Sequence, residues 1–413
     1  MIRNGNSIAR RHARPAVHRL SLAEIFRGAY STEAASPSRG SVSNSGSSSG
    51  SGSGRNETPK GHSGGQPPNK IPEVRTTEGA VNLFIFRLET FDPALPLVMR
   101  DSHQLPAMTK WFEPRGPHGT DHTFTPRLTK HSQTIFPYEL TDPSASATAV
   151  PGQHPSLRST LTEFRSWLIA HSNETYLPLM ALMAALADPS TLSEDASSSP
   201  PHPADLQQQE FRQFYAPLGL LARACEFNAT RSAYPRERLQ RLYIAQSSLG
   251  SLPGDLAAED LPTPALVRGA GKGDVYDSSV WLGLEPTYTP LHRDPNPNLF
   301  CQLLGEKRVR LLPPGKGQML YERVRRELGS QGNSRFRGAE MMGGREMVAL
   351  ERAVWGDDGV GDGDGDGDKD GQLDMQQTVL RPGDTMFIPN GWWHSIRSNG
   401  AGALNASVNW WFR

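Results

Sequence analysis

The second half of the chain contains a series of short apolar runs whose spacing limits the folds that this sequence can adopt. Turns rich in Gly, Pro and Asn separate the runs, which are Arg241–Ala245, Ser279–Leu282, Leu299–Leu303, Val309–Leu312, Thr378–Leu380, Thr385–Ile388 and Ala406–Phe412. Short apolar segments at this rhythm are typical of small antiparallel barrels and sandwiches. The pattern therefore predicts a mainly β structure for this half.

Helical spacing of apolar residues is more evident before these runs. Residues 157–187 place apolar side chains at intervals of three and four, which predicts one or two helices, and Phe211–Cys225 is a further amphipathic stretch. Closer to the N-terminus, a helix or turn precedes the apolar run Leu95–Met99, which has the character of a buried strand. We expect one domain with helices first and a β-barrel second.

Two segments at the N-terminus differ from this domain in composition. Residues 1–30 contain six arginines and no acid before Glu24, which is typical of a mitochondrial presequence. Pro15 would interrupt a helix there, so a disordered basic arm is the alternative. Residues 31–70 are rich in Ser, Gly and Pro and predict a disordered linker. We therefore expect the domain at 71–413 and a location in the mitochondrial matrix, with cytoplasm or nucleus as the alternative.

The overall composition disfavours several classes of protein. The 43 basic and 43 acidic residues balance, so no global field favours nucleic acid or an anionic membrane. Cys225 and Cys301 form neither a CxxC pair nor a zinc-ligand spacing, which argues against a disulfide-stapled or zinc-finger protein. No apolar run has the length that crosses a bilayer. The sequence thus predicts a protein without a membrane partner, and it leaves the oligomeric state open.

One His-x-Asp pair stands in the segment "YTPLHRDPNPNLF". His292 and Asp294 are two residues apart in an extended segment, so their side chains point to the same side and can bind one metal ion. Two imidazoles and a carboxylate on one face are typical of Fe(II) sites with open positions. His394, after the turn Pro389–Gly391, is the best candidate for the third ligand. A solvated His-x-Asp pair without metal is the alternative that the spacing leaves open.

Three segments together resemble the JmjC-type, cupin-like Fe(II)/2-oxoglutarate oxygenases. They are "TPLHRDPNPNLFCQLLGEKRVRLLPP", "LRPGDTMFIPNGWWHSIRS" and "ASVNWWFR", and the similarity covers residues 76–413. Within this family they look most like the small-domain hydroxylases related to the asparaginyl hydroxylase of hypoxia-inducible factor. The resemblance implies a double-stranded β-helix, or jelly roll, with N-terminal and flanking helices. It also implies Fe(II) bound by His292, Asp294 and His394, with 2-oxoglutarate and O2 as co-substrates.

The resemblance further implies a set of residues for 2-oxoglutarate. Lys307 matches the lysine that pairs with its distal carboxylate, and a lysine in an apolar strand is costly to bury without an anion. Tyr243 matches a tyrosine whose hydroxyl reaches the same carboxylate, and Thr289, Asn298 and Asn409 match positions that contact or border the co-substrate. The alternatives are structural: capped turns for Thr289 and Asn298, a satisfied strand edge for Asn409, and a core tyrosine for Tyr243.

Residues around these positions carry weaker signals. Arg293 stands where relatives often have an aromatic or amide residue, and strand alternation predicts that it faces away from the metal. One or two of five tryptophans should line a substrate cleft, the candidates being Trp281, Trp392, Trp393, Trp410 and Trp411.

An insertion at 315–377 interrupts the β rhythm. It begins with a predicted basic helix, Gln318–Leu328, and ends in a Gly/Asp repeat. Residues 366–377 fit much of an EF-hand loop, but Gln377 replaces the usual bidentate glutamate, which favours a low-complexity acidic loop.

The sequence therefore predicts an Fe(II)- and 2-oxoglutarate-dependent dioxygenase that hydroxylates a protein side chain. N-methyl-lysine demethylation and hydroxylation of a modified RNA base use the same chemistry and are alternatives. Nucleic acid is disfavoured because the chain lacks an extended basic face. A non-catalytic cupin-like binding module is the alternative from another class.

Overall fold

The computed structural model describes seven stretches of the chain, all within the unit formed by residues 64–413. They are 71–115, 121–142, 156–171, 177–187, 211–329, 344–356 and 374–413. The predicted presequence and linker, and residues 366–373 of the EF-hand-like loop, lie outside the described residues. None of the described helices is long and apolar enough to cross a membrane.

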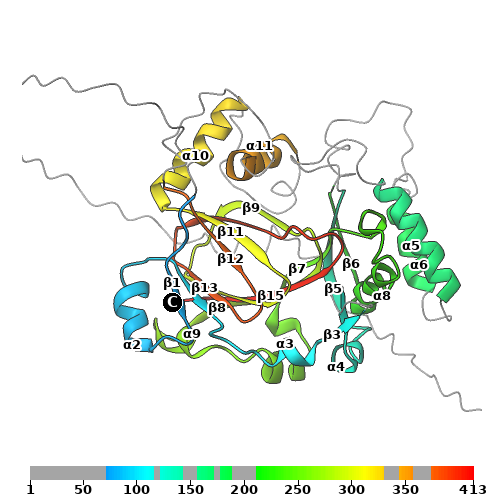
Figure 1. Ribbon diagram of the computed structural model, residues 1–413, viewed down its shortest axis with the longest axis horizontal. Coiled ribbons are helices and arrows are strands. Elements are labelled where there is room, and N and C mark those ends of the chain that lie inside the picture. Colours follow the sequence, from blue (N-terminus) through cyan, green and yellow to red (C-terminus); the bar gives the residue numbers. More distant parts are fainter. Residues whose placement is uncertain are drawn as a thin grey trace, which may run out of the picture. The chain divides into compact units, whose positions relative to one another are not determined.

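Two sheets form the body of this unit (Figure 1). The larger sheet has nine strands, in the order β1 (Thr76–Glu78), β2 (Leu97–Arg100), β13 (Thr385–Ile388), β10 (Asn298–Leu304), β15 (Leu404–Phe412), β8 (Val275–Leu284), β7 (Leu242–Ser248), β5 (Ile135–Thr141) and β6 (Phe211–Pro217). The smaller sheet has four, in the order β12 (Gln376–Leu380), β11 (Lys307–Leu312), β14 (Trp393–Arg397) and β9 (Tyr288–Arg293). Strand pairs are antiparallel in both sheets except β1 with β2.

The chain passes repeatedly between the two sheets from β8 to β15. Strands β8, β10, β13 and β15 belong to the larger sheet, and β9, β11, β12 and β14 to the smaller one. This connectivity closes an antiparallel jelly roll, so the predicted double-stranded β-helix is confirmed. Apolar side chains fill part of the space between the sheets, among them Phe300, Val309, Leu311, Met386 and Ile396.

Helices cover the outer faces of both sheets. On the larger sheet and around it lie α2 (Leu83–Phe86), η1 (Arg87–Phe91), α3 (Ala107–Lys110), α4 (Pro126–Thr129), α5 (Leu157–His171), α6 (Leu177–Ala187), α8 (Leu218–Ala229), η7 (Leu256–Asp260) and α9 (Ala265–Gly269). Helices α10 (Pro314–Glu327) and α11 (Gly344–Trp355) pack on the smaller sheet (Figure 1). The remaining elements are the hairpin β3 (Phe112–Arg115) and β4 (Asp121–Phe124), with the short turns η5 (Pro235–Glu237) and η6 (Leu249–Ser251).

The local sequence predictions were largely confirmed. All seven predicted runs form strands, the run ending at Met99 forms β2, and residues 157–187 form α5 and α6. The predicted basic helix is α10, which begins earlier, at Pro314. At the other end of the expected insertion, Gln376 and Gln377 already pair with β11. Helices α10 and α11 thus lie in the described parts of the connection between β11 and β12.

Two predictions about the N-terminal half were wrong. Helices do not come first, because β2, β5 and β6 join the larger sheet before the β-helix strands begin. The stretch Phe211–Cys225 is also not one helix: its first seven residues form β6, and α8 starts after Pro217. Pairing with β5 decides this, since Tyr138 and Phe214 stack across the two strands at 5.6 Å. Such a cross-strand pair is invisible in the periodicity of one segment.

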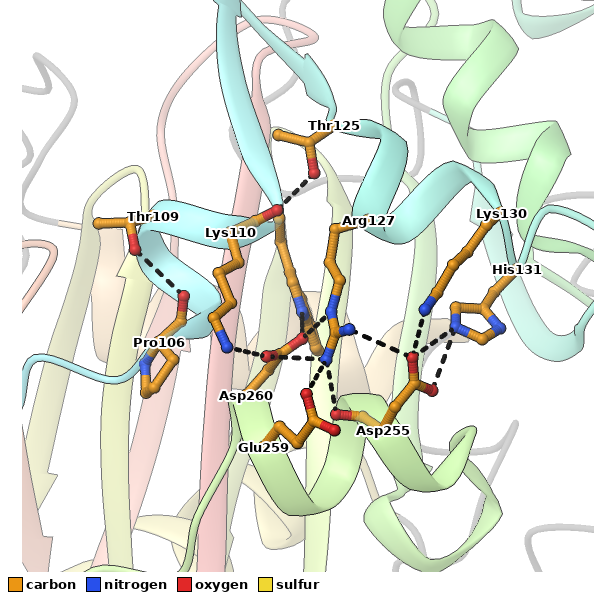
Figure 2. Close-up of polar contacts among 11 residues, drawn as sticks. Pro106, Thr109, Lys110, Thr125, Arg127, Lys130, His131, Asp255, Glu259 and Asp260 are labelled. Carbon is orange, nitrogen blue, oxygen red and sulfur yellow. Dashed lines mark hydrogen bonds and ion pairs between the residues drawn. The ribbon is translucent and has the colours of Figure 1, made fainter.

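A buried carboxylate joins three of the short helices beside the larger sheet (Figure 2). Asp260 of η7 is fully buried and accepts hydrogen bonds from Lys110 Nζ, Trp111 Nε1 and Arg127 Nε, each at 2.9 Å. Arg127 also donates to Glu259 at 2.8 Å. A buried charge is tolerated only when it is paired in this way, so the network fixes η7 against α3 and α4.

A second buried ion pair holds β4 to the segment before β7. The guanidinium of Arg238 donates two hydrogen bonds to Asp121, at 2.8 and 2.9 Å, and both side chains are less than 10% exposed. Bidentate geometry of this kind gives a strong and directional contact.

Candidate active site

Two histidines and an aspartate meet at one end of the space between the sheets. His292 lies near the end of β9, His394 near the start of β14, and the two are direct cross-strand partners. Asp294 follows β9, with its carboxylate oxygens 3.8 Å from His292 Nε2 and 3.6 Å from His394 Nε2. One ligand atom from each residue lies within 4.8 Å of the others. Sequence spacing and sheet register together bring the three predicted ligands to one point.

Hydrogen bonds fix which ring nitrogen each histidine can offer. Nδ1 of His292 lies 2.8 Å from the carbonyl of Pro290, and Nδ1 of His394 lies 3.1 Å from the carbonyl of Trp392. A carbonyl only accepts, so both Nδ1 atoms carry the proton and both Nε2 atoms keep their lone pair. Burial, and then the neighbouring His292, lowers the pKa of His394, which keeps this imidazole neutral. Two imidazoles that present Nε2 and a carboxylate are a donor set that fits Fe(II).

The turn before β14 aims His394 into the interior. Gly391 adopts φ +79°, a conformation that side-chain-bearing residues rarely adopt, and its amide donates to the carbonyl of Asp294 at 3.4 Å. Two residues later, Trp393 pairs with Arg293 and His394 with His292. Arg293 is exposed and its guanidinium lies 5.5 Å from the Trp393 ring, on the side away from the ligands. The predicted orientation of Arg293 is confirmed.

A buried lysine lies further inside. Lys307, the first residue of β11, is 3% exposed, and its Nζ donates to Ser407 Oγ at 2.9 Å and Tyr243 Oη at 3.1 Å. Within the described part of the chain, no carboxylate lies within 4 Å of this ammonium. Burial lowers the pKa of Lys307 to about 7. A desolvated ammonium held only by hydroxyls fits the distal carboxylate of a dicarboxylic acid.

A relay of hydrogen bonds runs from the larger sheet to Asp294. Trp281 Nε1 donates to Asn409 Oδ1 at 2.7 Å, Asn409 Nδ2 donates to Asn298 Oδ1 at 3.1 Å, and Asn298 Nδ2 donates to Asp294 Oδ2 at 2.9 Å. The indole can only donate, so it sets the direction of both amides. The predicted co-substrate residues Asn298 and Asn409 therefore engage each other and the ligand carboxylate.

Thr289, another predicted co-substrate residue, lies on β9 close to this centre. Thr289 lies opposite Ile396, which faces the interior, and the Thr289 carbonyl accepts from Ser395 Oγ at 2.9 Å. Sequence reasoning missed Ser407 as a partner of Lys307. Its position was recoverable, because it stands two residues before Asn409 in "ASVNWWFR" and so shares its face.

Two of the five tryptophans lie on the inner face of the larger sheet. One is Trp281 of β8, whose indole donates a hydrogen bond to Asn409 of β15. The other is Trp411 of β15, which lies two residues after Asn409 and so on the same face of the strand. Trp410 belongs to the outer core of the larger sheet and Trp393 to that of the smaller sheet. Trp392 donates to the carbonyl of Ala94 at 3.0 Å. Trp281 and Trp411 are therefore the two tryptophans that face the interior, and a cleft role for them stays a prediction.

The double-stranded β-helix, with two imidazoles, a carboxylate and a buried lysine in its interior, has the architecture of the cupin-like class of proteins. A model of the cupin-like domain family matches residues 188–413, more than half of the chain. The chain belongs to this family, and the curated proteins that it resembles include JmjC-domain proteins.

Three relatives illustrate the range of the similarity. Jumonji C domain-containing protein 5 of Drosophila melanogaster is 28% identical over 171 residues, which are 41% of this chain and 36% of that protein. Lysine-specific demethylase 8 of Danio rerio is 27% identical over 172 residues, 41% of this chain and 36% of that protein. The human bifunctional peptidase and (3S)-lysyl hydroxylase JMJD7 is 25% identical over 179 residues, 41% of this chain and 53% of that protein. The chain thus spans about a third of the first two relatives.

Proposed function

We propose that this protein is an Fe(II)- and 2-oxoglutarate-dependent oxygenase that hydroxylates a side chain of a protein. The observation that carries the proposal is the pairing of two features in one interior: three convergent ligand atoms and a buried lysine without an anion. The names of the relatives, a lysine-specific demethylase and a lysyl hydroxylase, describe proteins that act on protein side chains and support a protein substrate.

Three of the residues would bind the metal, and the others would bind the co-substrate. His292, Asp294 and His394 would hold the iron through Nε2 atoms and a carboxylate, and the carbonyls of Pro290 and Trp392 keep both rings in the ligating tautomer. When bound, the iron with 2-oxoglutarate activates O2, and the acid is oxidised to succinate and CO2 while one oxygen atom enters a substrate C–H bond.

The deeper residues would bind and orient the acid. Lys307 would pair with the distal carboxylate, and Tyr243 and Ser407 hold the ammonium in place from two sides. The apolar residues between the sheets exclude water from this end of the site, which strengthens the ion pair. Asn298 donates to Asp294 Oδ2 and so fixes the orientation of this carboxylate, whose two oxygens each lie near one of the two histidine Nε2 atoms.

Demethylation of an N-methyl group is the second candidate, because one of the relatives carries that name. The two outcomes differ in the product. Hydroxylation adds one oxygen atom to the substrate, whereas demethylation removes a methyl group as formaldehyde. Mass spectrometry of a modified substrate with a formaldehyde assay separates them.

Anaerobic titration of 2-oxoglutarate into Fe(II)-loaded protein tests the proposed function. The chelate of Fe(II) with 2-oxoglutarate gives a weak charge-transfer band at about 500 nm. We expect this band in the wild type and in His171→Ala, whose histidine lies on the exposed side of α5. We expect its loss in His394→Ala. A folded, metal-loaded wild type without the band would refute the oxygenase and favour a non-catalytic cupin-like module.

We also propose that residues 1–30 direct the protein to the mitochondrial matrix, on the basis of their six arginines and their lack of acids before Glu24. Fusion of this segment to a fluorescent protein should give mitochondrial import. A version with the arginines replaced by glutamine should stay outside, and import of both versions alike would contradict the proposal.

A further inference from the structure

The inner face of the larger sheet is ordered in rows that run across neighbouring strands. The row at the ligand cluster contains Asn298, Trp411 and Asp277. Farther from the cluster along β15 and β8, one row pairs Ser407 with Trp281 and the next pairs Asn405 with Gly283. Ser407 contacts Lys307. The row of Asn405 and Gly283 therefore lies beyond the ammonium, at the end of the interior opposite to the ligand cluster.

An acidic residue lies beside this last row. Glu285 follows Gly283 by two residues, so strand alternation places its side chain on the same inner face. Its amide donates to the carbonyl of Ala403, and its carbonyl accepts from the amide of Gly402, both at 2.8 Å. Pairing of the two chain segments thus continues as far as Glu285, which is 7% exposed.

Two buried amide side chains hold the carboxylate of Glu285 in place. Asn405 Nδ2 donates to Glu285 Oε1 at 2.7 Å, and Gln302 Nε2 donates to Asn405 Oδ1 at 3.1 Å. Each amide therefore uses an N–H toward the next acceptor, and the sequence of bonds ends on the carboxylate. The backbone of Gly400 also packs against it, since a Cβ at this position would lie 1.6 Å from Glu285 Oε2. The carboxylate is held in the interior at a defined position.

The carboxylate of Glu285 and the ammonium of Lys307 act on each other through space, because they lie more than 4 Å apart. Burial raises the pKa of Glu285, whereas the hydrogen bond from Asn405 and the charge of Lys307 lower it. Burial lowers the pKa of Lys307, and Glu285 opposes this effect. Charges in a buried environment are screened less than charges in water, so this attraction persists over several ångströms.

Other charged groups near Glu285 lie on the wall of a cavity of about 390 Å³ that Glu285 also lines. They are Glu306, Arg308 and His122. Glu306 has a 58% exposed side chain and pairs with Arg381 at 3.1 Å, so water and a cation screen its charge. Glu285 is therefore the buried acid of this group, and Lys307 is the buried cation on which it acts.

We propose that Glu285 is a positioning residue for 2-oxoglutarate: through Lys307, its carboxylate keeps the buried ammonium charged in the empty site. This rests on the proposed function, because Lys307 is the residue assigned to the distal carboxylate of the acid. The hydroxyls of Tyr243 and Ser407 orient the ammonium but carry no charge that could offset its burial. A neutral amine would present no positive charge to the incoming anion, and Glu285 prevents this without touching the acid.

Loss of the Glu285 charge has a definite sign in the pH dependence. Burial is then opposed less, so Lys307 releases its proton at a lower pH. Above that pH the site has to take up a proton when the acid binds, and the affinity for 2-oxoglutarate falls as pH rises. Glu285 also repels the bound anion, which changes the affinity itself but not the pH at which the ammonium of the empty site titrates.

NMR of the full-length apoprotein, isotope-labelled at the lysine Cε, follows the titration of Lys307, whose signal is identified by its loss in Lys307→Met. Glu285→Gln keeps an acceptor for Asn405 and removes the charge. We expect it to lower the titration midpoint of Lys307 by at least about half a pH unit. Glu285→Asp keeps the charge, so its midpoint should lie closer to that of the wild type. Glu306→Gln removes an exposed charge from the same cavity and should leave the midpoint unchanged.

Calorimetric titration of 2-oxoglutarate into the Zn(II)-loaded full chain tests the consequence for binding. The dissociation constant is measured at about pH 6 and about pH 8 for the wild type and for Glu285→Gln. We expect its increase between these pH values to be at least about twofold larger in Glu285→Gln than in the wild type. A residue with a merely structural role would weaken binding by the same factor at both pH values.

The outcomes separate this inference from the proposed function. An unchanged midpoint in Glu285→Gln, or a midpoint that Glu285→Asp lowers more than Glu285→Gln, would overturn the role of Glu285 even in protein that gives the charge-transfer band. An equal shift in Glu306→Gln, or a shift in Glu285→Gln without the change in the pH dependence of binding, would overturn it as well. A shifted midpoint in protein whose wild type binds no 2-oxoglutarate would uphold the action of Glu285 on Lys307 and refute the oxygenase.

Discussion

Replacing Lys307 by methionine should stabilise the apoprotein while removing its response to 2-oxoglutarate. In the folded protein, burial lowers the pKa of Lys307 to about 7, against an ordinary value near 10.5. The difference corresponds to a folding penalty on the order of 4 kcal/mol at neutral pH. Methionine avoids this penalty but leaves Tyr243 and Ser407 without their shared donor, at a cost of about 1 kcal/mol each. We therefore expect a net gain of about 2 kcal/mol in the free energy of unfolding at neutral pH.

The pH dependence has a definite sign. The folded-state pKa of Lys307 is depressed, so between pH 7 and 10.5 the unfolded chain binds the proton more tightly than the folded one. The wild-type free energy of unfolding should therefore rise through this window, with the penalty complete below it and absent above it. Lys307→Met should lack this contribution. Urea unfolding of both apoproteins at several pH values in the window measures the difference.

Ligand linkage supplies the second half of the test. At a concentration of 2-oxoglutarate one hundred times its dissociation constant, the metal-loaded wild type should gain about 2.7 kcal/mol, and Lys307→Met should gain almost nothing. Lys272→Met, at an exposed lysine before β8, is the matched control and should respond like the wild type. A Lys307→Met protein that is less stable than the wild type at neutral pH and still stabilised by 2-oxoglutarate would refute the reasoning.

Three further perturbations address the supporting structure. Asp121→Asn leaves the buried Arg238 guanidinium without its carboxylate and should lower the free energy of unfolding by about 3 kcal/mol. A loss below about 1 kcal/mol, measured by urea unfolding, would contradict this account. Burial raises the pKa of Asp260, but the hydrogen bonds from Arg127, Lys110 and Trp111 outweigh it and lower this pKa. The contribution of Asp260 to the free energy of unfolding should therefore disappear as pH falls through its folded-state pKa. Asp260→Asn should weaken the dependence of this free energy on pH in the acid range. Trp281→Phe removes the donor that starts the relay to Asp294 and should weaken Zn(II) binding about tenfold, whereas Trp410→Phe, on the outer face, should leave metal affinity unchanged.

The strands were predictable where their signal is local. Alternation, apolar runs and turn residues lie within a few positions of each other, so the seven predicted runs were recognised as strands and the resemblance supplied the arrangement of the fold. The partners of β5 and β6 were not predictable, because pairing depends on contacts such as Tyr138 with Phe214 across a long separation in sequence. For the same reason the sequence did not reveal that Phe211–Pro217 forms a strand and not the start of an amphipathic helix.

The sequence by itself determined which groups could serve the site. The spacing of His292 and Asp294 places both on one side of an extended segment, the turn before His394 made it the candidate third ligand, and the resemblance supplied Lys307. Their proposed roles in binding iron and 2-oxoglutarate stay predictions that the titrations above decide. The structure adds that the side chains of His292, Asp294 and His394 converge, which sequence spacing could not show because His394 lies on a different strand.

Only the tertiary structure decided the environment of each group. The ligating tautomers depend on two backbone carbonyls, and the lowered pKa of Lys307 depends on the burial of its ammonium between the sheets. The row of Asn298, Trp411 and Asp277 exists because register aligns three strands that are distant in sequence. A sequence specifies side-chain chemistry position by position, whereas burial, pairing and unsatisfied polar atoms arise from non-local contacts that form only when the sheets close.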